Sequence, residues 1–297
     1  MEKKRLRILD IIRKTIDLHV HVGPEVLPRK HNLLSLFENQ KNKIRKICIK
    51  SHCYSTVSWA KLVNETFNTD FFIGSVTLNN FVGGVNLDLL YADANMTKAP
   101  FVVWLPTIHA ENYLKKSEWE IRKEWVMDPD FKPRKSETIR PVKIFEEGRL
   151  TKDILGLLEY VRDSNCVLAT GHISWQESES VVERALSMGS RKVVVTHPIY
   201  QLIDMPIEVQ KKLAKMGAYI EHSYAMHSID KISYNEIVNQ IKEVGPKHCI
   251  LSSDVGQPFS PNPDAALSDF AASLIERGLT YDEIYQMLVD NPRQLVK

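Results

Sequence analysis

Two histidines separated by one residue, His19 and His21, end a short apolar run that starts at Thr15 and leads into Gly23. Side chains alternate across a β-strand, so residues two apart point to the same side. Two imidazoles on one side of a strand end could bind a metal ion together, because histidine is the commonest metal ligand. A pair of structural histidines would show the same spacing, so support for a metal site has to come from the rest of the chain.

The same arrangement recurs further along, where three more apolar runs lead directly into His172, His197 and Asp254. Reactive side chains of a parallel barrel gather at the carboxyl-terminal ends of its strands. Most of the histidines lie at or just beyond such a predicted strand end: His19, His21, His52, His109, His172, His197 and His222. We therefore expect residues that are distant in sequence to meet at one rim.

Short apolar segments alternate with segments of helical period along the whole chain, which is typical of repeated strand–helix units around a parallel sheet. The predicted strands are 15–20, 46–50, 71–77, 101–105, 165–170, 192–196, 218–221 and 248–253. The predicted helices are 33–43, 57–67, 87–95, 152–162, 177–188, 206–215, 234–243, 265–277 and 281–290. The glycine-rich nucleotide motifs are absent. The sequence therefore predicts an α/β fold, a (β/α)8 TIM barrel that forms a single domain over 1–297.

One long, charged segment, 111–150, interrupts this alternation after the fourth strand and ends in a predicted hairpin that turns at Glu147-Gly148. Loops of such length on a compact domain usually serve as lids or interface elements. Large aromatic residues lie in and around it: Trp104, Trp119, Trp125 and Phe131. They could form a lid, a contact between copies in a homo-oligomer, or local packing.

The composition is that of an ordinary globular protein. Of 297 residues 43% are hydrophobic and 26% charged, and the formal net charge is +2. The chain lacks a basic stripe with interleaved aromatics, an apolar run of membrane-spanning length and a signal peptide, so we expect no nucleic-acid or membrane partner and a cytoplasmic location. The cysteines Cys48, Cys53, Cys166 and Cys249 lack C-x-x-C spacing, which predicts free thiols.

These strand-end residues resemble the amidohydrolase superfamily, whose metal-dependent barrels carry H-x-H on the first strand, histidines on the fifth and sixth, and an aspartate on the eighth. Several phrases look like those of one uncharacterised branch, the DUF6282 family. They are Lys50-Ser-His52, Thr170-Gly-His172-Ile-Ser174, Thr196-His-Pro198, Glu221-His222-Ser-Tyr224, Ser252-Ser-Asp-Val-Gly-Gln257 and the closing Asn291-Pro-Arg-Gln-Leu295. The resemblance covers nearly the whole chain and implies little about the substrate.

The resemblance implies the metal ligands His19, His21, His172, His197 and Asp254. They would hold one or two divalent ions, Zn first, with Mn, Fe, Co or Ni as alternatives. Asp254 would act as the catalytic acid and base, and His197, if it is not a ligand, would polarise a carbonyl. Binuclear members usually place a bridging lysine or glutamate on the fourth strand, and segment 101–105 offers neither. Lys50, if carboxylated, or Glu221 could take its place, so we expect one tightly held ion and leave a second open.

Polar residues at other strand ends could bind a small-molecule substrate. They are Arg29, Lys50, His52, Asn79, His109, Tyr200, His222, Tyr224 and Gln257. Arg29 would suit a carboxylate or phosphate, because a planar guanidinium pairs with two oxygens. The first hypothesis for the reaction is hydrolysis of a C–N or C–O bond, in a cyclic amide, lactone or ester, by a metal-activated water. The alternatives are non-oxidative decarboxylation at one metal, phosphoester hydrolysis by a barrel of the PHP type, and a metal-binding barrel without catalysis.

Overall fold

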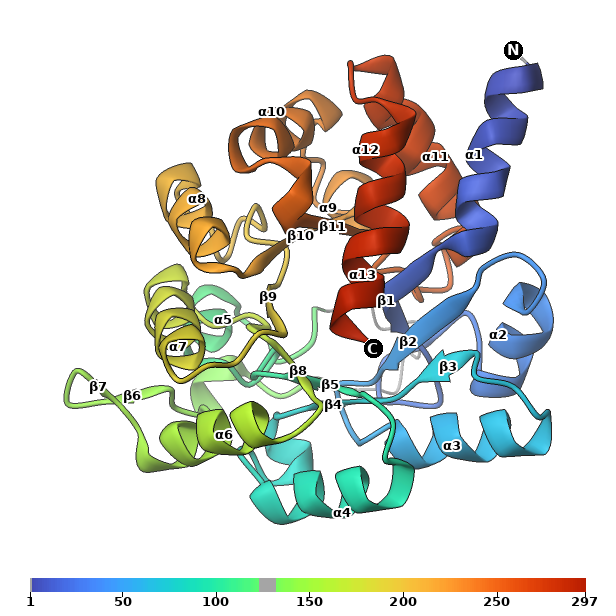
Figure 1. Ribbon diagram of the computed structural model, residues 1–297. Coiled ribbons are helices and arrows are strands. Elements are labelled where there is room, and N and C mark those ends of the chain that lie inside the picture. Colours follow the sequence, from blue (N-terminus) through green and yellow to red (C-terminus); the bar gives the residue numbers. More distant parts are fainter. Residues whose placement is uncertain (1, 123–131) are drawn as a thin grey trace.

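The computed structural model describes residues 2–122 and 132–297, so Trp125 and Phe131 lie outside the described residues. Figure 1 shows a ring of strands with helices around its outside. The wall consists of parallel strands, in chain order: β1 (Ile16–His21), β2 (Lys46–Lys50), β3 (Phe72–Ile73), β4 (Ser75–Thr77), β5 (Val102–Trp104), β8 (Val167–Ala169), β9 (Val193–Val195), β10 (Tyr219–Ser223) and β11 (Cys249–Ser252). Each predicted strand is present, with its ends shifted by at most two residues and with 71–77 divided into β3 and β4.

These strands pair in two sheets, of order β1-β2-β3 and β11-β10-β9-β8-β5-β4. Only Gly74 separates β3 from β4, so these two continue one another as a single strand position of the barrel. At the other junction, an isolated parallel bridge joins Val20 to Val255, and the N–H of Asp254 donates to the carbonyl of His19 over 2.8 Å. The predicted (β/α)8 arrangement is thus confirmed over the described residues.

The helices surround the strands, except the last, whose Leu295 packs with the residues inside the barrel. The helices are α1 (Glu2–Lys14), α2 (Leu33–Gln40), α3 (Val57–Thr66), α4 (Leu87–Thr97), α5 (Glu111–Lys116), α6 (Lys152–Asp163), α7 (Trp175–Ser187), α8 (Ile207–Met216), α9 (Tyr224–Ser228), α10 (Tyr234–Val244), α11 (Pro263–Glu276), α12 (Tyr281–Tyr285) and α13 (Asn291–Leu295). Thr151 and Ser233 cap α6 and α10 with their side chains. The expected last helix 281–290 continues through a π-helical turn, Gln286–Asp290, into α13. Helices α5 and α9 are too short to leave a periodic pattern in the sequence.

The segment after β5 contains the expected hairpin, in which β6 (Phe145–Glu146) pairs antiparallel with β7 (Arg149–Leu150). Glu147 and Gly148 form its turn with positive φ angles of 49° and 74°. The four cysteines are free thiols, as expected. In the described part of the chain, none of the helices combines the length and the apolar character that crossing a membrane requires.

A β-bulge in β1 decides which way the two histidines point. The pairing of β1 with β2 shifts register between Asp17 and Val20. Below the shift, Ile16 and Leu18 pack inside the barrel together with Trp104 of β5. Above it, Val20 belongs to the outer core between strands and helices. The bulge therefore turns the histidines that flank Val20 toward the barrel axis, at the rim where the apolar filling ends.

Candidate metal centre

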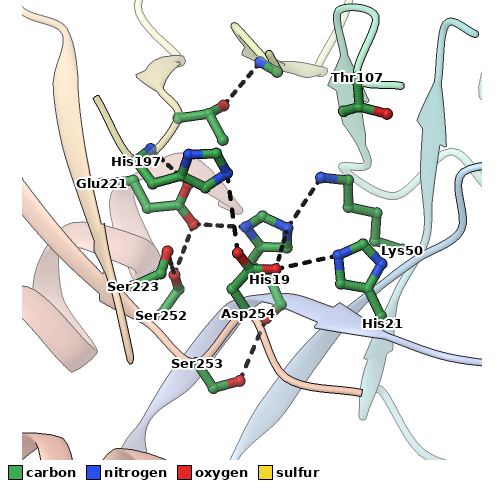
Figure 2. A network of polar contacts seen from close by, with 12 residues as sticks. His19, His21, Lys50, Thr107, His197, Glu221, Ser223, Ser252, Ser253 and Asp254 are labelled. Atoms are coloured by element: carbon green, nitrogen blue, oxygen red, sulfur yellow. Dashed lines mark hydrogen bonds and ion pairs between the residues drawn. The ribbon is translucent and has the colours of Figure 1, made fainter. Parts of the chain in front are cut away.

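His19, His197 and Asp254 come together as one buried group at the carboxyl-terminal rim of the barrel, although they lie on different strand ends. Their ligand atoms all lie within 4.8 Å of one another. Nε2 of His19 is 3.1 Å from Oδ1 of Asp254, and Nε2 of His197 is 3.9 Å from Oδ2. Figure 2 shows the imidazoles converging on this carboxylate. Two neutral nitrogens and a carboxylate oxygen are ligands that zinc accepts, so this group fits a divalent cation.

Glu221 of β10 lies directly behind His19. Its Oε1 is 3.0 Å from Nδ1 of His19 and also accepts a hydrogen bond from Ser252 Oγ over 2.7 Å. Because a carboxylate accepts here, Nδ1 of His19 carries the proton, and the lone pair of Nε2 accepts from Nζ of Lys50 while lying beside the carboxylate of Asp254. The structure thus places Glu221 as an orienting partner of His19, and not in the bridging position that the sequence left open for it.

Lys50 ends β2 with its side chain fully buried. Its Nζ lies 3.0 Å from Nε2 of His19 and 4.0 Å from the centre of the Trp104 ring. Trp104 ends β5, the fourth strand position of the barrel, which as expected from the sequence carries neither a lysine nor a glutamate. Burial lowers the pKa of Lys50 and raises the pKa of Asp254, while the attraction between the two groups opposes both shifts.

His21 also contacts Asp254, with Nε2 3.1 Å from Oδ1. On its other side, Nδ1 faces Nη2 of Arg29 at 3.2 Å. A guanidinium can only donate, so Nδ1 accepts and the proton of His21 lies on Nε2. To bind a metal through Nε2, His21 would have to take the other tautomer and Arg29 would have to leave Nδ1. Arg29 itself is ion-paired with Glu25, which matches its charge.

His172 lies next to His197, with ring centres 5.3 Å apart, but its nitrogens are not part of the group around Asp254. Nδ1 of both rings is buried without a hydrogen-bond partner among the described residues. Burial lowers the pKa of both histidines, to about 3 for His197. Both are therefore neutral at pH 7, which is the form that binds metals.

A pocket opens above this group. It is lined by His21, Arg29, His52, Ile108, Tyr113, His172, His197, Tyr200, Ala225, Met226, Ile229, Asp230, Asp254 and Gln257. Among the expected substrate residues, Arg29, His52, Tyr200 and Gln257 thus lie on its wall. Asp230 was not selected from the sequence, because it follows α9 in a turn and ends no apolar run.

Asn79 and His109 are used in holding the rim together. The side chain of Asn79 donates to His52 O and Thr107 Oγ1 and accepts from the N–H groups of Thr107 and His109. Nδ1 of His109 accepts from the N–H of Asn80 over 3.0 Å, and Nε2 donates to Glu120 over 2.6 Å. Neither side chain lines the pocket. Their strand-end positions predicted substrate binding, but their hydrogen-bonding capacity is spent inside the protein.

Two further expected substrate residues, His222 and Tyr224, also lie off the pocket wall. Glu221 faces the barrel interior, so His222, the next residue of β10, faces the opposite side. Both of its ring nitrogens are buried without a partner in the part of the chain that the structure describes. Tyr224 begins α9 and packs toward Phe270 of α11, with ring centres 6.2 Å apart.

The long segment after β5 is fastened to the rim by Glu120. This carboxylate accepts from His109 Nε2 and from Arg134 Nε, the latter over 3.0 Å. Burial would raise the pKa of Glu120, but the hydrogen bonds from His109 and Arg134 outweigh it and lower the pKa to about 2. Arg122 of the same segment donates to the hydroxyl of Tyr200 over 2.9 Å, so the segment borders the pocket. Trp104, by contrast, fills the barrel interior and takes no part in a lid.

Comparison with solved structures agrees with the barrel. The structure of YJJV, a TATD homolog from Escherichia coli K12, shares 15% identity over 96% of this chain and 98% of its own, with a TM-score of 0.60. An amidohydrolase from Pseudomonas aeruginosa shares 10% identity over 97% of both chains, with a TM-score of 0.56. N-acetyl-D-glucosamine-6-phosphate deacetylase from Mycobacterium smegmatis shares 10% identity over 95% of this chain and 76% of its own, with a TM-score of 0.54.

At these identities the likeness concerns the fold alone. Among curated proteins, none matches the sequence. One family profile, described as a family of unknown function, matches residues 14–221, which include the predicted ligands on β1 and after β8 and β9 and the orienting Glu221. This match spans more than half of the sequence, and the chain therefore belongs to the DUF6282 family.

Proposed function

We propose that this protein is a metal-dependent hydrolase that cleaves a C–N or C–O bond in a small cyclic amide, lactone or ester. The observation that carries the proposal is the convergence of His19, His197 and Asp254 at the base of a pocket on the carboxyl-terminal rim. Structural relatives named as an amidohydrolase and a deacetylase support a hydrolytic reaction class. The proposal includes a small-molecule substrate and a cytoplasmic location.

His19, His197 and Asp254 would hold the ion, Zn first, with His21 and His172 close enough to the group to be further candidates. A bound divalent cation would lower the pKa of a water molecule and polarise a carbonyl group. Asp254, whose pKa is raised by burial, lies where it can accept a proton from the attacking water and return it to the leaving group. Glu221 keeps the lone pair of His19 directed at the group throughout.

Lys50 and Arg29 add two positive charges beside the carboxylates of this region. Lys50 donates to the lone pair of His19 that an ion would use, so when an ion binds Lys50 would have to withdraw, or lose a proton and react as the neutral amine with carbon dioxide to form a carbamate. Arg29 fixes the tautomer of His21 and leaves its Nε2–H pointing at Asp254. That bond orients the carboxylate for proton transfer.

The experiment is a reconstitution screen. The purified protein is depleted of metal, reloaded with Zn²⁺, Mn²⁺, Co²⁺ or Fe²⁺, and assayed against panels of lactams, lactones and esters. We expect hydrolysis that depends on the ion, is lost in His19→Ala and is retained in His248→Gln, which changes a histidine at the opposite end of β11. Inactivity with every ion would overturn the proposal. Carbon dioxide release from aromatic or enol acids, or turnover of phosphate esters, would replace it with one of the alternatives.

A further inference from the structure

Asp230 lies on the wall of the pocket but takes no part in the group at its base. Its side chain is only 10% exposed. Among the described residues no side chain or backbone N–H within hydrogen-bond distance donates to its carboxylate. It forms a long ion pair with Arg122, whose Nη1 lies 3.9 Å away. Within the part of the chain that the structure describes, Asp230 is thus a nearly buried carboxylate on the pocket wall whose oxygens accept no hydrogen bond.

The turn that carries Asp230 is held firmly by hydrogen bonds on both sides. The N–H of Lys231 donates to the carbonyl of His227 over 3.1 Å, and the N–H of Ile232 donates to the carbonyl of Met226 over 3.0 Å. Nδ1 of His227 donates to the carbonyl of Ile232 over 2.8 Å. Because these bonds tie the turn to α9, the position of Asp230 over the pocket is built into the backbone.

A carboxylate removed from water without hydrogen bonds is costly to the folded protein. Burial accordingly raises the pKa of Asp230, although Arg122 and Lys231 lower it. A ligand that brings N–H donors and a positive charge would relieve this cost. The approach of Arg122 shows that the surroundings of Asp230 admit a cation.

The other charged side chain on the upper wall is satisfied differently. Arg29 is ion-paired with Glu25, whose second oxygen accepts from Ser51 Oγ and from the N–H of His52, each over 2.8 Å. A substrate anion at Arg29 would compete with this close pair, whereas a substrate cation at Asp230 would compete only with the longer 3.9 Å contact of Arg122. The pocket is therefore better prepared for a cationic group.

We propose that Asp230 determines substrate specificity by binding a protonated primary amine, so that the substrates are small cyclic amides or lactones that carry such an amine. The apolar side chains of Ile108, Met226 and Ile229 on the same wall would contact the hydrocarbon part of the ring. The identity of the bond that is cleaved rests on the proposed function, but binding of the amine does not.

The test uses matched substrates that differ only in the amine: α-amino-ε-caprolactam against ε-caprolactam, and α-amino-γ-butyrolactone against γ-butyrolactone. The amine also changes the intrinsic reactivity of the substrate. The informative quantity is therefore the kcat/KM for the amine-bearing substrate divided by the kcat/KM for its amine-free partner, and this ratio is compared between wild type and variant. Asp230→Asn should lower this ratio by about 10- to 100-fold, which is the worth of a charge-assisted hydrogen bond. Asp230→Glu, which keeps the charge, should retain most of the preference for the amine-bearing substrate.

Asp204→Asn is the matched control, because Asp204 is exposed on the loop after β9 and does not line the pocket. It should keep the wild-type ratio. A ratio that is the same in wild type and Asp230→Asn would overturn the inference, provided that the variant melts like wild type. Equal preference for α-hydroxy-γ-butyrolactone would also overturn it, since a hydroxyl donates hydrogen bonds without a charge.

A binding measurement separates this inference from the proposed reaction. Calorimetric titration of the purified protein with α-amino-ε-caprolactam should give a Kd at least ten times lower for wild type than for Asp230→Asn. If this difference is found and no compound is hydrolysed, the proposed function fails and the amine site stands. If lactams are hydrolysed and neither the Kd nor the ratio depends on Asp230, the amine site fails and the hydrolase stands.

Discussion

Oε1 of Glu221 on β10 accepts the Nδ1 proton of His19 on β1 over 3.0 Å, past the intervening strand β11. The bond determines which nitrogen of His19 is left with a lone pair, and that lone pair faces Nζ of Lys50 beside the carboxylate of Asp254. Partners of this kind orient a metal ligand and raise its basicity without touching the ion.

Replacing Glu221 should therefore weaken metal binding without removing a ligand. We expect Glu221→Ala to raise the Kd for Zn²⁺ by about 10- to 100-fold, measured by competition with a chelating dye. Glu221→Gln should lose less Zn²⁺ affinity, because the amide oxygen of glutamine can still accept from Nδ1 of His19. Glu146→Gln, an exposed position in the hairpin, is the control. Unchanged affinity in Glu221→Ala would mean that His19 is not a ligand.

Metal should also stabilise the folded chain, because the group around Asp254 exists only when the barrel is formed. At an ion concentration of a hundred times Kd the gain is about 2.7 kcal/mol, which corresponds to roughly 4 °C in Tm for a chain of this size. Differential scanning calorimetry with and without Zn²⁺ measures it. The shift should vanish in His19→Ala and persist in His248→Gln. Equal shifts in both variants would place the ion elsewhere.

Glu120 should make stability depend on pH. Its pKa is about 2 in the folded protein, below the value near 4.3 expected for an unfolded chain. The ionised form therefore stabilises the fold above about pH 4.5, and this contribution is lost as the pH falls toward 2. Glu120→Gln should be less stable than wild type by roughly 1–3 kcal/mol at pH 7, with a smaller gap at pH 3. Urea unfolding at both pH values checks this; a constant gap would refute the role of the charge.

Gly256 has no room for a side chain. A Cβ there would lie 2.4 Å from the carbonyl oxygen of His21 and 2.6 Å from its Cβ, and its φ is +148°. Gly256→Ala should push the end of β1 outward and lower both Tm and Zn²⁺ affinity. Gly189→Ala shares a positive φ but meets nothing within 4 Å. It should cost about 1 kcal/mol of stability and leave the affinity unchanged, which isothermal titration would show.

Asn79 should matter for stability rather than for substrate. Its amide makes four hydrogen bonds in a fully buried position. Asn79→Ala would leave several of these partners unmatched and should cost roughly 2–4 kcal/mol in urea unfolding. If the variant instead has wild-type stability but a raised KM, Asn79 is a substrate-binding residue.

The group around Asp254 could be predicted from the sequence. Reactive residues lie at the carboxyl-terminal ends of barrel strands, and a strand end can be recognised from the local sequence pattern alone. His19, His197 and Asp254 each end an apolar run, and the structure brings them together. The same rule selected Asn79, His109 and His222, whose side chains bond to the rim or face the helices. Such partners lie far away in sequence and leave no local signal. Asp230 was missed for the converse reason, since a turn after a five-residue helix shows no periodicity.

The bulge in β1 has a consequence for how this protein could change over time. Because the strand switches its facing between Leu18 and His19, the packing of the lower barrel and the chemistry of the upper rim are set by separate stretches of one strand. Mutations that alter the rim need not be compensated by repacking beneath it. New activities could therefore arise here by substitution alone, on a scaffold whose interior stays the same.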